Sequence, residues 1–308
     1  MSSLWAFPGQ GAQRPGMLQA LPEAAVVREC VEEASDVLGA PVTDLDSPQQ
    51  LRDTRAVQLC LLIAGVACAR LLAERGNRAD YMAGLSIGAY AAAVACGALQ
   101  YADAVRLVAL RGELMQRAYP SGYGMTAIVG LDQRSLEGLL EHADGPVYLA
   151  NINADNQLVI AGSDAAMAAV AGQARALGAG AAKRLAMSVP SHCELLAAPA
   201  SELRAAFAEV TLQRPRIAYL SGSSARLIND SERLRDDLAG NMCRVVNWQA
   251  TLHTAYERGV RLHLELPPGT VLSGLARRVF EPGQVIAFEG ARPDTLDALL
   301  REEVSRSR

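Results

Sequence analysis

The sequence predicts an α/β protein in two parts, a large domain with a mainly parallel sheet and a small ferredoxin-like domain inserted into it. Short apolar strands alternate with helices over residues 4–118, which is typical of a parallel sheet covered by helices. Residues 124–189 instead follow the order strand, helix, strand, strand, helix, strand, which defines the split βαβ unit. We therefore predict a large domain over 1–123 and 190–308 and a small domain over 124–189.

The first part of the large domain opens with the apolar segment LWAF at 4–7, a short strand that ends at the turn PGQG. A second short strand is predicted over 80–84. The longest apolar stretch, Val57–Leu72, is interrupted by Gln58 and Arg70 and is short for a membrane span, so it predicts a buried helix. The helices predicted here are one near 18–21 and others over 24–38, 56–74, 87–99 and 102–118.

The small domain begins after the turn at 120–124 and ends at Pro190. Its four strands are GMTAIVG, VYLANIN, NQLVIAG and AKRLAMSVP, and its two helices are SLEGLLEHA and DAAMAAVAGQARAL. Beyond Pro190 the large domain resumes. It is predicted to contain helices over 195–209, 231–239, 248–258 and 270–279 and strands over 216–221 and 260–266.

Composition narrows the functional classes. The 308 residues carry a formal net charge of −4, whereas general nucleic-acid binding needs a basic stripe. The six cysteines form no C-x-x-C pair and lie mostly in apolar helical stretches, as buried thiols do in a reduced compartment. The amino terminus lacks the basic start and apolar run of a signal peptide. We therefore expect a cytoplasmic protein with no metal centre, no membrane contact and no nucleic-acid partner.

The segment G-L-S-I-G at 84–88 joins the predicted strand 80–84 to the helix that follows. Glycines beside a serine permit the strained turn that pushes a nucleophilic hydroxyl outward. The N–H of the next residue, Ile87, would then point at a developing oxyanion. The structural alternative is that Ser86 only caps the helix. The strand before the motif and the helix after it favour the nucleophile.

A serine nucleophile needs a base, and the chain has four histidines. His142 is expected at the end of an exposed helix and His253 on a partly exposed one. His263 alternates with leucines along a strand, so we expect it to be solvated or paired. His192 lies in SVPSHC, where the small domain returns to the large one, and a loop at a domain junction reaches a cleft. We predict His192 as the base, and both a triad and a Ser-His dyad remain open.

Arg111 is the one charge in the apolar stripe of the helix over 102–118. By helical spacing it falls between Leu107 and Val108 on one side and Leu114 and Met115 on the other. An arginine on an inward face is rarely left without a partner. An internal ion pair is the structural alternative, which the helix alone favours. The functional alternative is a substrate carboxylate, which guanidinium binds through two parallel hydrogen bonds.

Six segments together resemble the malonyl-CoA:acyl carrier protein transacylases and the acyltransferase domains of polyketide and fatty acid synthases. They occur in family order and span nearly the whole chain. The resemblance implies a hydrolase-like α/β domain with a ferredoxin-like insertion, in agreement with the strand and helix pattern. The segments are FPGQGAQ at 7–13, GLSIGAY at 84–90, VRLVALRGELMQ at 105–116, NINADNQLVIAG at 151–162, SVPSHC at 188–193 and LELPPGTVLSGL at 264–275.

The resemblance implies a role for each matching residue. Ser86 would be the acylated nucleophile and His192 its base. The main-chain carbonyl of Asn241 would orient the imidazole, which makes a Ser-His dyad the preferred arrangement. Gln10, in the P-G-Q-G turn, would supply the second oxyanion N–H beside that of Ile87.

The resemblance also implies the reaction, in which Arg111 would hold the carboxylate of a malonyl group. The donor would be malonyl-CoA, the acceptor the thiol of an acyl carrier protein, and no bound cofactor is implied. Relatives usually carry G-H-S-x-G-E, but here Leu85 replaces the histidine and Ala89 the glutamate. Together with the segment FPGQGAQRPGML, these two residues most resemble the malonate decarboxylase branch of the family. That branch has its own carrier subunit, and we expect the chain to belong to it. The alternatives are the transacylase of fatty acid synthesis, an esterase or thioesterase, and a non-catalytic scaffold subunit.

The carrier is expected to dock near the cleft between the two domains. For each candidate cation the structural alternative is an ordinary solvated surface charge. The candidates are Arg184, Arg244, Arg277 and Arg278.

Overall fold

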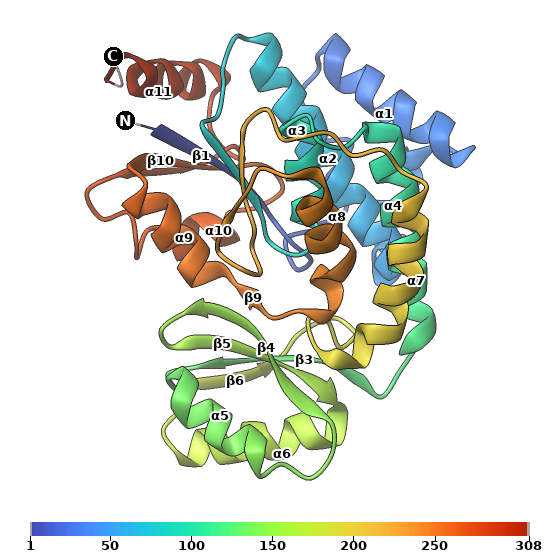
Figure 1. Cartoon of the computed structure of the whole chain (residues 1–308), viewed down its shortest axis with the longest axis vertical. Helices are drawn as coiled ribbons and strands as arrows, with labels where there is room; N and C mark the ends of the chain where they lie inside the picture. Colours follow the sequence, from blue (N-terminus) through green and yellow to red (C-terminus); the bar gives the residue numbers. More distant parts are fainter. Residues whose placement is uncertain (1, 307–308) are drawn as a thin grey trace.

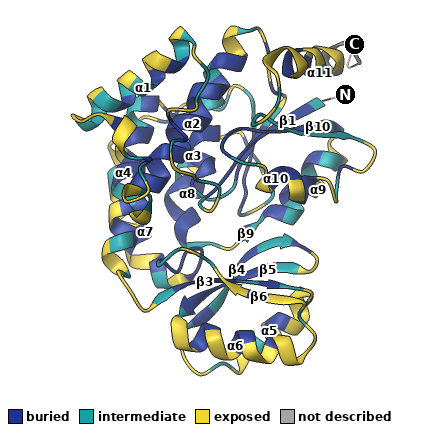
Figure 2. Ribbon diagram, turned by 180° about the vertical axis from the view of Figure 1, so that it is seen from behind, coloured by how far each residue is buried: buried dark blue, intermediate teal, exposed yellow. Residues whose placement is uncertain are grey.

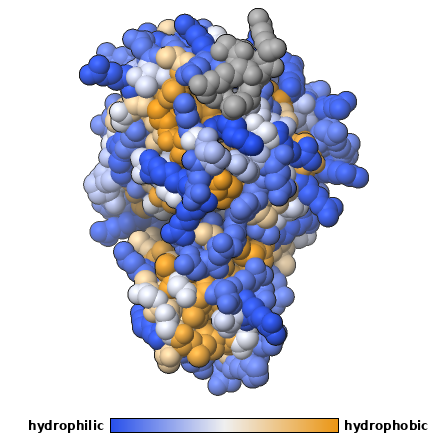
Figure 3. Space-filling view, turned by 90° about the vertical axis from the view of Figure 1, so that its left-hand side faces the viewer, coloured by the Kyte–Doolittle hydropathy of each residue, from blue (hydrophilic) through white to orange (hydrophobic). Residues whose placement is uncertain are grey.

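The computed structural model describes residues 2–306, with side chains described through residue 302. Figure 1 shows an upper part with both chain ends and a lower part built from β3–β6 with α5 and α6. The predicted α/β class with a second, smaller sheet is thereby confirmed. Side chains on the face in Figure 3 are mostly hydrophilic, with apolar patches on both parts.

The large sheet has six strands in the order β11-β10-β1-β2-β7-β8. All neighbours are parallel except β8, which pairs with β7 antiparallel. Because neighbouring parallel strands point the same way, the segments that follow β1 and β2 meet at one edge of the sheet. The strands are β1 (Ser2–Phe7), β2 (Tyr81–Gly84), β7 (Ala218–Leu220), β8 (Leu227–Ile228), β10 (Val260–Glu265) and β11 (Gln284–Ala287).

Helices cover both faces of this sheet, so its strands are apolar on both sides. Along β1, Trp5 and Phe7 join the core beneath α1–α4, while Leu4 and Ala6 join the core beneath α9 and α10. The helices are α1 (Ala25–Leu38), α2 (Thr54–Glu74), α3 (Gly88–Ala95), α4 (Tyr101–Ala118), α7 (Ala197–Ala208), α8 (Ser231–Gly240), α9 (Trp248–Glu257), α10 (Val271–Ala276) and α11 (Pro293–Arg306). Short 3₁₀ turns lie at Val42–Asp44, Gln50–Arg52, Glu194–Leu196 and Asn241–Cys243.

Helix α2 is long and apolar enough by composition to cross a membrane, but 89% of its most apolar window is buried inside the protein. It packs against α1, α3 and α4, and most of its length is buried in Figure 2. This agrees with the buried helix predicted from the sequence.

The second sheet has five strands in the order β6-β3-β5-β4-β9. Four of them come from the predicted insertion and are antiparallel, and β9 joins β4 in parallel from the later part of the chain. Figure 2 shows α5 and α6 with exposed outer faces on the side of this sheet away from the large part. The elements are β3 (Tyr123–Val129), α5 (Gln133–Glu141), β4 (Val147–Ala154), β5 (Gln157–Ser163), α6 (Asp164–Ala176), β6 (Ala181–Arg184) and β9 (Val246–Asn247).

Three sequence predictions are wrong. The segment 18–21 forms turns rather than a helix. The last small-domain strand stops at Arg184, because residues 185–191 leave the sheet as a loop toward the cleft. His263 is fully buried, neither solvated nor paired, because α9, α10 and Phe280 cover the face of β10 that was expected to be open. The strands β8, β9 and β11 and the helix α11 were not predicted.

Candidate active site

The serine turn joins β2 to α3 at the carboxyl end of the sheet. Ser86 has φ 56°, a left-handed backbone conformation that residues other than glycine seldom adopt and that often occurs at functional sites. A Cβ on Gly84 would lie 2.0 Å from the Gly88 carbonyl carbon, and a Cβ on Gly88 would lie 2.2 Å from the Phe7 oxygen. Only glycine fits at either position, so these two residues allow the tight turn that presents Ser86.

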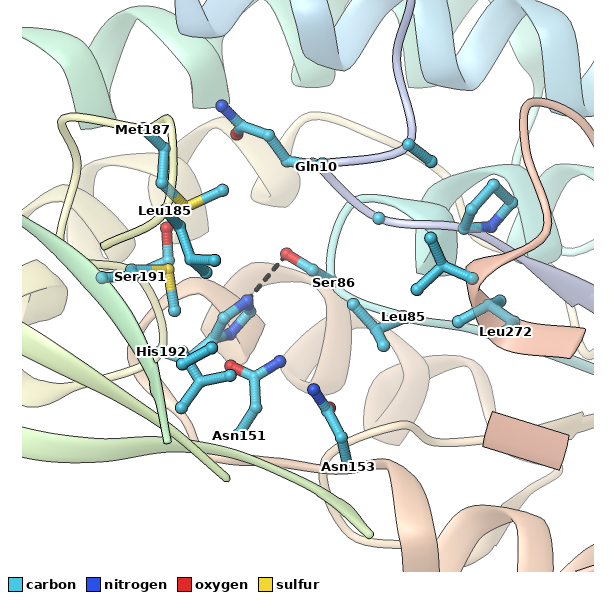
Figure 4. A pocket seen from close by; sticks show the side chains of 18 of the residues that line it. Gln10, Leu85, Ser86, Asn151, Asn153, Leu185, Met187, Ser191, His192 and Leu272 are labelled. Carbon is cyan, nitrogen blue, oxygen red and sulfur yellow. Dashed lines mark hydrogen bonds between the residues drawn. The ribbon is translucent and has the colours of Figure 1, made fainter. Parts of the chain in front are cut away.

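His192 lies in the loop after β6 and meets Ser86 across the cleft (Figure 4). The imidazole Nε2 lies 2.8 Å from Ser86 Oγ. The Nδ1 lies 2.8 Å from the main-chain oxygen of Asn241 and 3.2 Å from that of Arg244. Since carbonyls only accept hydrogen bonds, Nδ1 carries the proton and Nε2 is left to accept from the Ser86 hydroxyl. Among the described side chains no carboxylate contacts His192, so the arrangement is a Ser-His dyad.

The protein interior keeps this imidazole neutral. His192 is buried, and burial together with the nearby charge of Arg111 lowers its pKa to about 4. Its backbone is also constrained, with φ 66° and its N–H donating to the Met242 oxygen at 2.7 Å. The imidazole is therefore unprotonated and oriented at neutral pH, so its free nitrogen can accept a proton, and its low pKa makes it a weaker base than one that titrates near 7.

Arg111 projects from α4 toward Ser86 and is only 1% exposed. Its Nη2 donates to Ser86 Oγ at 3.3 Å and to Asn241 Oδ1 at 3.1 Å, and its guanidinium lies 5.9 Å from the centre of the Tyr90 ring. Its Nε has no hydrogen-bond partner, and burial lowers the pKa of the guanidinium. Within the described side chains no acid pairs with Arg111, so the internal ion pair considered from the helix pattern is absent. A buried cation beside the serine thus remains uncompensated.

The side chain of Asn241 makes contacts that sequence reasoning did not anticipate. Its Nδ2 donates to the Ser86 main-chain oxygen at 3.1 Å, while its Oδ1 accepts from Arg111. Its own main-chain oxygen accepts from His192. One residue at the end of α8 therefore positions the serine, the imidazole and the guanidinium together.

The two amides expected to form an oxyanion hole are both available. Gln10 lies in the turn after β1, and Ile87 directly follows Ser86. Among the described residues neither amide nitrogen donates to a protein acceptor. Figure 4 shows Gln10 and His192 on different sides of Ser86. Unpaired backbone N–H groups beside a nucleophile can receive a developing negative charge.

The dyad opens into a pocket of about 260 Å³ between the two parts. Leu85 and Leu272 form one apolar side, and Asn151 and Asn153 reach it from the small sheet (Figure 4). Gln58 also lines it, a buried amide whose Nε2 lies 3.3 Å from Met115 Sδ and whose Oε1 has no partner. Sequence reasoning assigned no function to Gln58, although a single amide in an apolar helix was the available signal.

The four arginines considered for carrier docking differ in their surroundings. Arg184 donates to several main-chain oxygens and pairs with Asp164 at 2.9 Å, and Arg244 pairs with Asp236 at 2.8 Å. Arg278 donates to the Asn156 side chain at 3.2 Å. The exposed Arg277 has no side-chain partner within the described part of the chain. Only Arg277 is therefore wholly uncommitted.

Known proteins resemble this chain over nearly its whole length. The acyl transferase domain family matches residues 4–303. The malonyl CoA-acyl carrier protein transacylase of Escherichia coli K12 is 36% identical over 283 residues, covering 89% of this chain and 92% of its own length. FabD from Acinetobacter baumannii superposes with a TM-score of 0.91 at 35% identity, covering 99% of both chains. A malonyl-transacylase solved in complex with a type II PKS acyl-carrier protein superposes at 0.90 with 35% identity, covering 94% and 97%.

Proposed function

Because the chain belongs to the acyl transferase family, we propose that it transfers a malonyl group from malonyl-CoA to the thiol of an acyl carrier protein. The observation that carries this proposal is the uncompensated Arg111 guanidinium, 3.3 Å from Ser86 Oγ. A cation buried beside a nucleophile favours an acyl group that bears its own carboxylate. An acetyl group would leave this cation desolvated and unpaired, which disfavours it as a substrate.

The transfer proceeds in two steps through a malonyl-serine ester. His192 Nε2 takes the proton of Ser86 as Oγ attacks the thioester carbonyl carbon. The amides of Gln10 and Ile87 stabilise the oxyanion, each worth about 3 kcal/mol in comparable sites. The carbon–sulfur bond breaks, and CoA leaves with the proton from His192. The carrier thiol then gives its proton to His192, attacks the ester and releases Ser86, whose oxygen recovers that proton.

The identity of the carrier is the finer part of the proposal. Relatives named malonyl CoA-acyl carrier protein transacylase support a general acyl carrier protein. They favour this alternative over the malonate decarboxylase branch that the sequence led us to expect. The decarboxylase carrier remains a second candidate because Leu85 and Ala89 depart from the usual family motif. Leu85 makes one side of the pocket beside Ser86 apolar.

Intact mass spectrometry after mixing with malonyl-CoA tests the proposed intermediate. We expect a malonyl adduct that is absent from Ser86→Ala and that disappears when an acceptor carrier is added. Failure to form the adduct, or its persistence in Ser86→Ala, contradicts the proposal. Rapid loss of the adduct without any acceptor indicates a thioesterase, and no exchange with any carrier indicates a scaffold.

The rates of malonyl transfer to the two carriers distinguish these two candidate functions. The malonylated protein is mixed with a general 4′-phosphopantetheine carrier or with the malonate decarboxylase carrier subunit, and malonyl transfer to each is followed by mass. Faster transfer to the first supports the general transacylase, and faster transfer to the second supports the decarboxylase branch.

A further inference from the structure

A second cavity, of about 690 Å³, lies at the end of the large sheet opposite the active site. Ser86 lies just after the end of β2. The cavity is instead lined by Asn77 and Ala79, which lie just before the start of β2. Trp5 of β1 and Ile217, just before β7, complete this side. The cavity therefore has no part in malonyl transfer as derived above.

The walls of this cavity combine apolar side chains with polar ones. Val66 and Ala69 come from α2, Val94 from α3, and Met82 and Leu99 from the segments around them. Figure 2 shows α2 and α3 next to β1 in the buried interior of the large part. The volume lies within the range of roughly 300–1,000 Å³ typical of small-molecule sites. These apolar side chains suit the apolar body of a ligand.

The charged side chains at this cavity are all positive. Arg70, Arg78 and Arg216 line it, and no Asp or Glu does. Arg70 is already committed, since it pairs with Glu33 at 2.7 Å. Arg78 and Arg216 are exposed, and their guanidinium groups have no hydrogen-bond or ion-pair partner in the part of the chain that the structure describes. Two uncommitted cations thus stand beside an apolar chamber.

Local backbone structure holds Arg216 at this position. Its N–H donates to the Cys96 oxygen at 2.8 Å, and the Gln213 N–H donates to the Ala98 oxygen at 2.8 Å. Between these anchors lies Gly97, where an added Cβ would be 3.2 Å from Arg216 Cδ. The side chain of Arg216 therefore lies close against the end of α3, which fixes its stem at the cavity.

We propose that this cavity binds an amphiphilic carboxylate, with an apolar chain in the chamber and its carboxylate between Arg78 and Arg216. Guanidinium groups bind a carboxylate through paired, charge-assisted hydrogen bonds. The apolar walls remove the chain from water, and this favours a carboxylate with a tail over a small hydrophilic anion. The inference rests on the cavity alone and does not depend on the transferase proposal.

Titration calorimetry with decanoate as the probe tests this site. The host is the full chain carrying Arg111→Ala, because the active-site guanidinium would also attract a carboxylate. We expect saturable binding of one decanoate, weakened at least about tenfold when Arg78→Gln and Arg216→Gln are added together. Arg258→Gln, an exposed arginine outside the cavity, is the matched control and leaves binding unchanged. Unfolding curves check that each variant is folded.

Three results would overturn the proposal. The first is no saturable binding of decanoate to the Arg111→Ala host. The second is equal binding by the Arg78→Gln, Arg216→Gln protein. The third is decan-1-ol binding as tightly as decanoate, because the arginines would then contribute nothing. Val94→Trp, which fills the chamber without changing charge, is expected to weaken decanoate binding as well, and unchanged binding there also contradicts the site.

Discussion

The side-chain oxygen of Asn241 accepts a hydrogen bond from Arg111 Nη2 at 3.1 Å, so a neutral amide faces the buried guanidinium where an acid would neutralise it. The amide holds the guanidinium in place but leaves its charge uncompensated. A carboxylate at this position would pair with Arg111 and compete with a substrate carboxylate. Asn241 therefore combines positioning of the dyad with preservation of the charge that we propose selects malonyl.

Replacing Asn241 in two ways separates these effects. Asn241→Ala keeps the main-chain oxygen that orients His192 and removes two side-chain hydrogen bonds, so we expect malonyl loading about tenfold slower. Asn241→Asp adds a carboxylate against Arg111, and we expect a loss of at least about a hundredfold. The rate of adduct formation, followed by rapid quench and mass spectrometry, checks the order. An Asp variant that loads as fast as the Ala variant contradicts this role.

We expect Arg111→Met to make the folded protein more stable and to reduce malonyl loading. A buried charge without an ionic partner opposes folding, and Met suits the apolar neighbours Leu107 and Met115. We expect a gain of about 1–3 kcal/mol in the free energy of unfolding, measured by urea denaturation. Malonyl loading should fall sharply, while acetyl loading from acetyl-CoA should rise, because no unpaired cation then lies beside the acyl group. A variant that is destabilised, or that still prefers malonyl over acetyl, would show that Arg111 has another purpose.

The pH dependence of malonyl loading should follow His192. In the proposed mechanism its neutral form is the base, and burial lowers its pKa to about 4. Loading should therefore stay nearly constant from pH 8 to about pH 5 and fall with a midpoint near pH 4, whereas an unperturbed histidine titrates near 6.5. Asn241→Asp should move the midpoint upward, because its carboxylate offsets the charge of Arg111. A wild-type midpoint near 6.5 contradicts this assignment.

Local pattern was enough to predict much of the fold. The alternation of strand and helix, the serine turn and the split βαβ unit each depend on residues close together in sequence. Contacts between segments that are far apart in sequence were harder to predict. The Ser86–His192 pair was suggested by a loop at a domain junction, but the side-chain contacts of Asn241 depend on where α8 ends in space. The strand β9 has only two residues, too few to carry a pattern.

His263 shows why a local pattern can mislead. Alternating leucines in VRLHLEL correctly mark β10 as a strand, and a half-exposed strand would turn its polar residues to solvent. In the large sheet, however, β10 lies between β1 and β11 with helices over both faces. Whether the second face is covered depends on α9 and α10, and the residue pattern within β10 carries no information about those helices. His263 is consequently buried against Phe280, with neither ring nitrogen hydrogen-bonded.

Burial of His263 predicts a specific acid sensitivity. Burial lowers its pKa to about 3 in the folded protein, whereas an unfolded histidine titrates near 6.5. As pH falls below 6.5 the unfolded chain binds a proton that the folded chain refuses, so stability decreases until pH reaches the folded pKa. At pH 5 the free energy of unfolding is lower by about 2 kcal/mol than at pH 7.

His263→Leu keeps an apolar contact with Phe280 and should lose about 2 kcal/mol less over that interval. Urea denaturation at both pH values measures the difference, with the exposed His253→Gln as the matched control. Equal losses in wild type and His263→Leu would show that His263 is protonated in the folded protein, and therefore that it is not isolated from water.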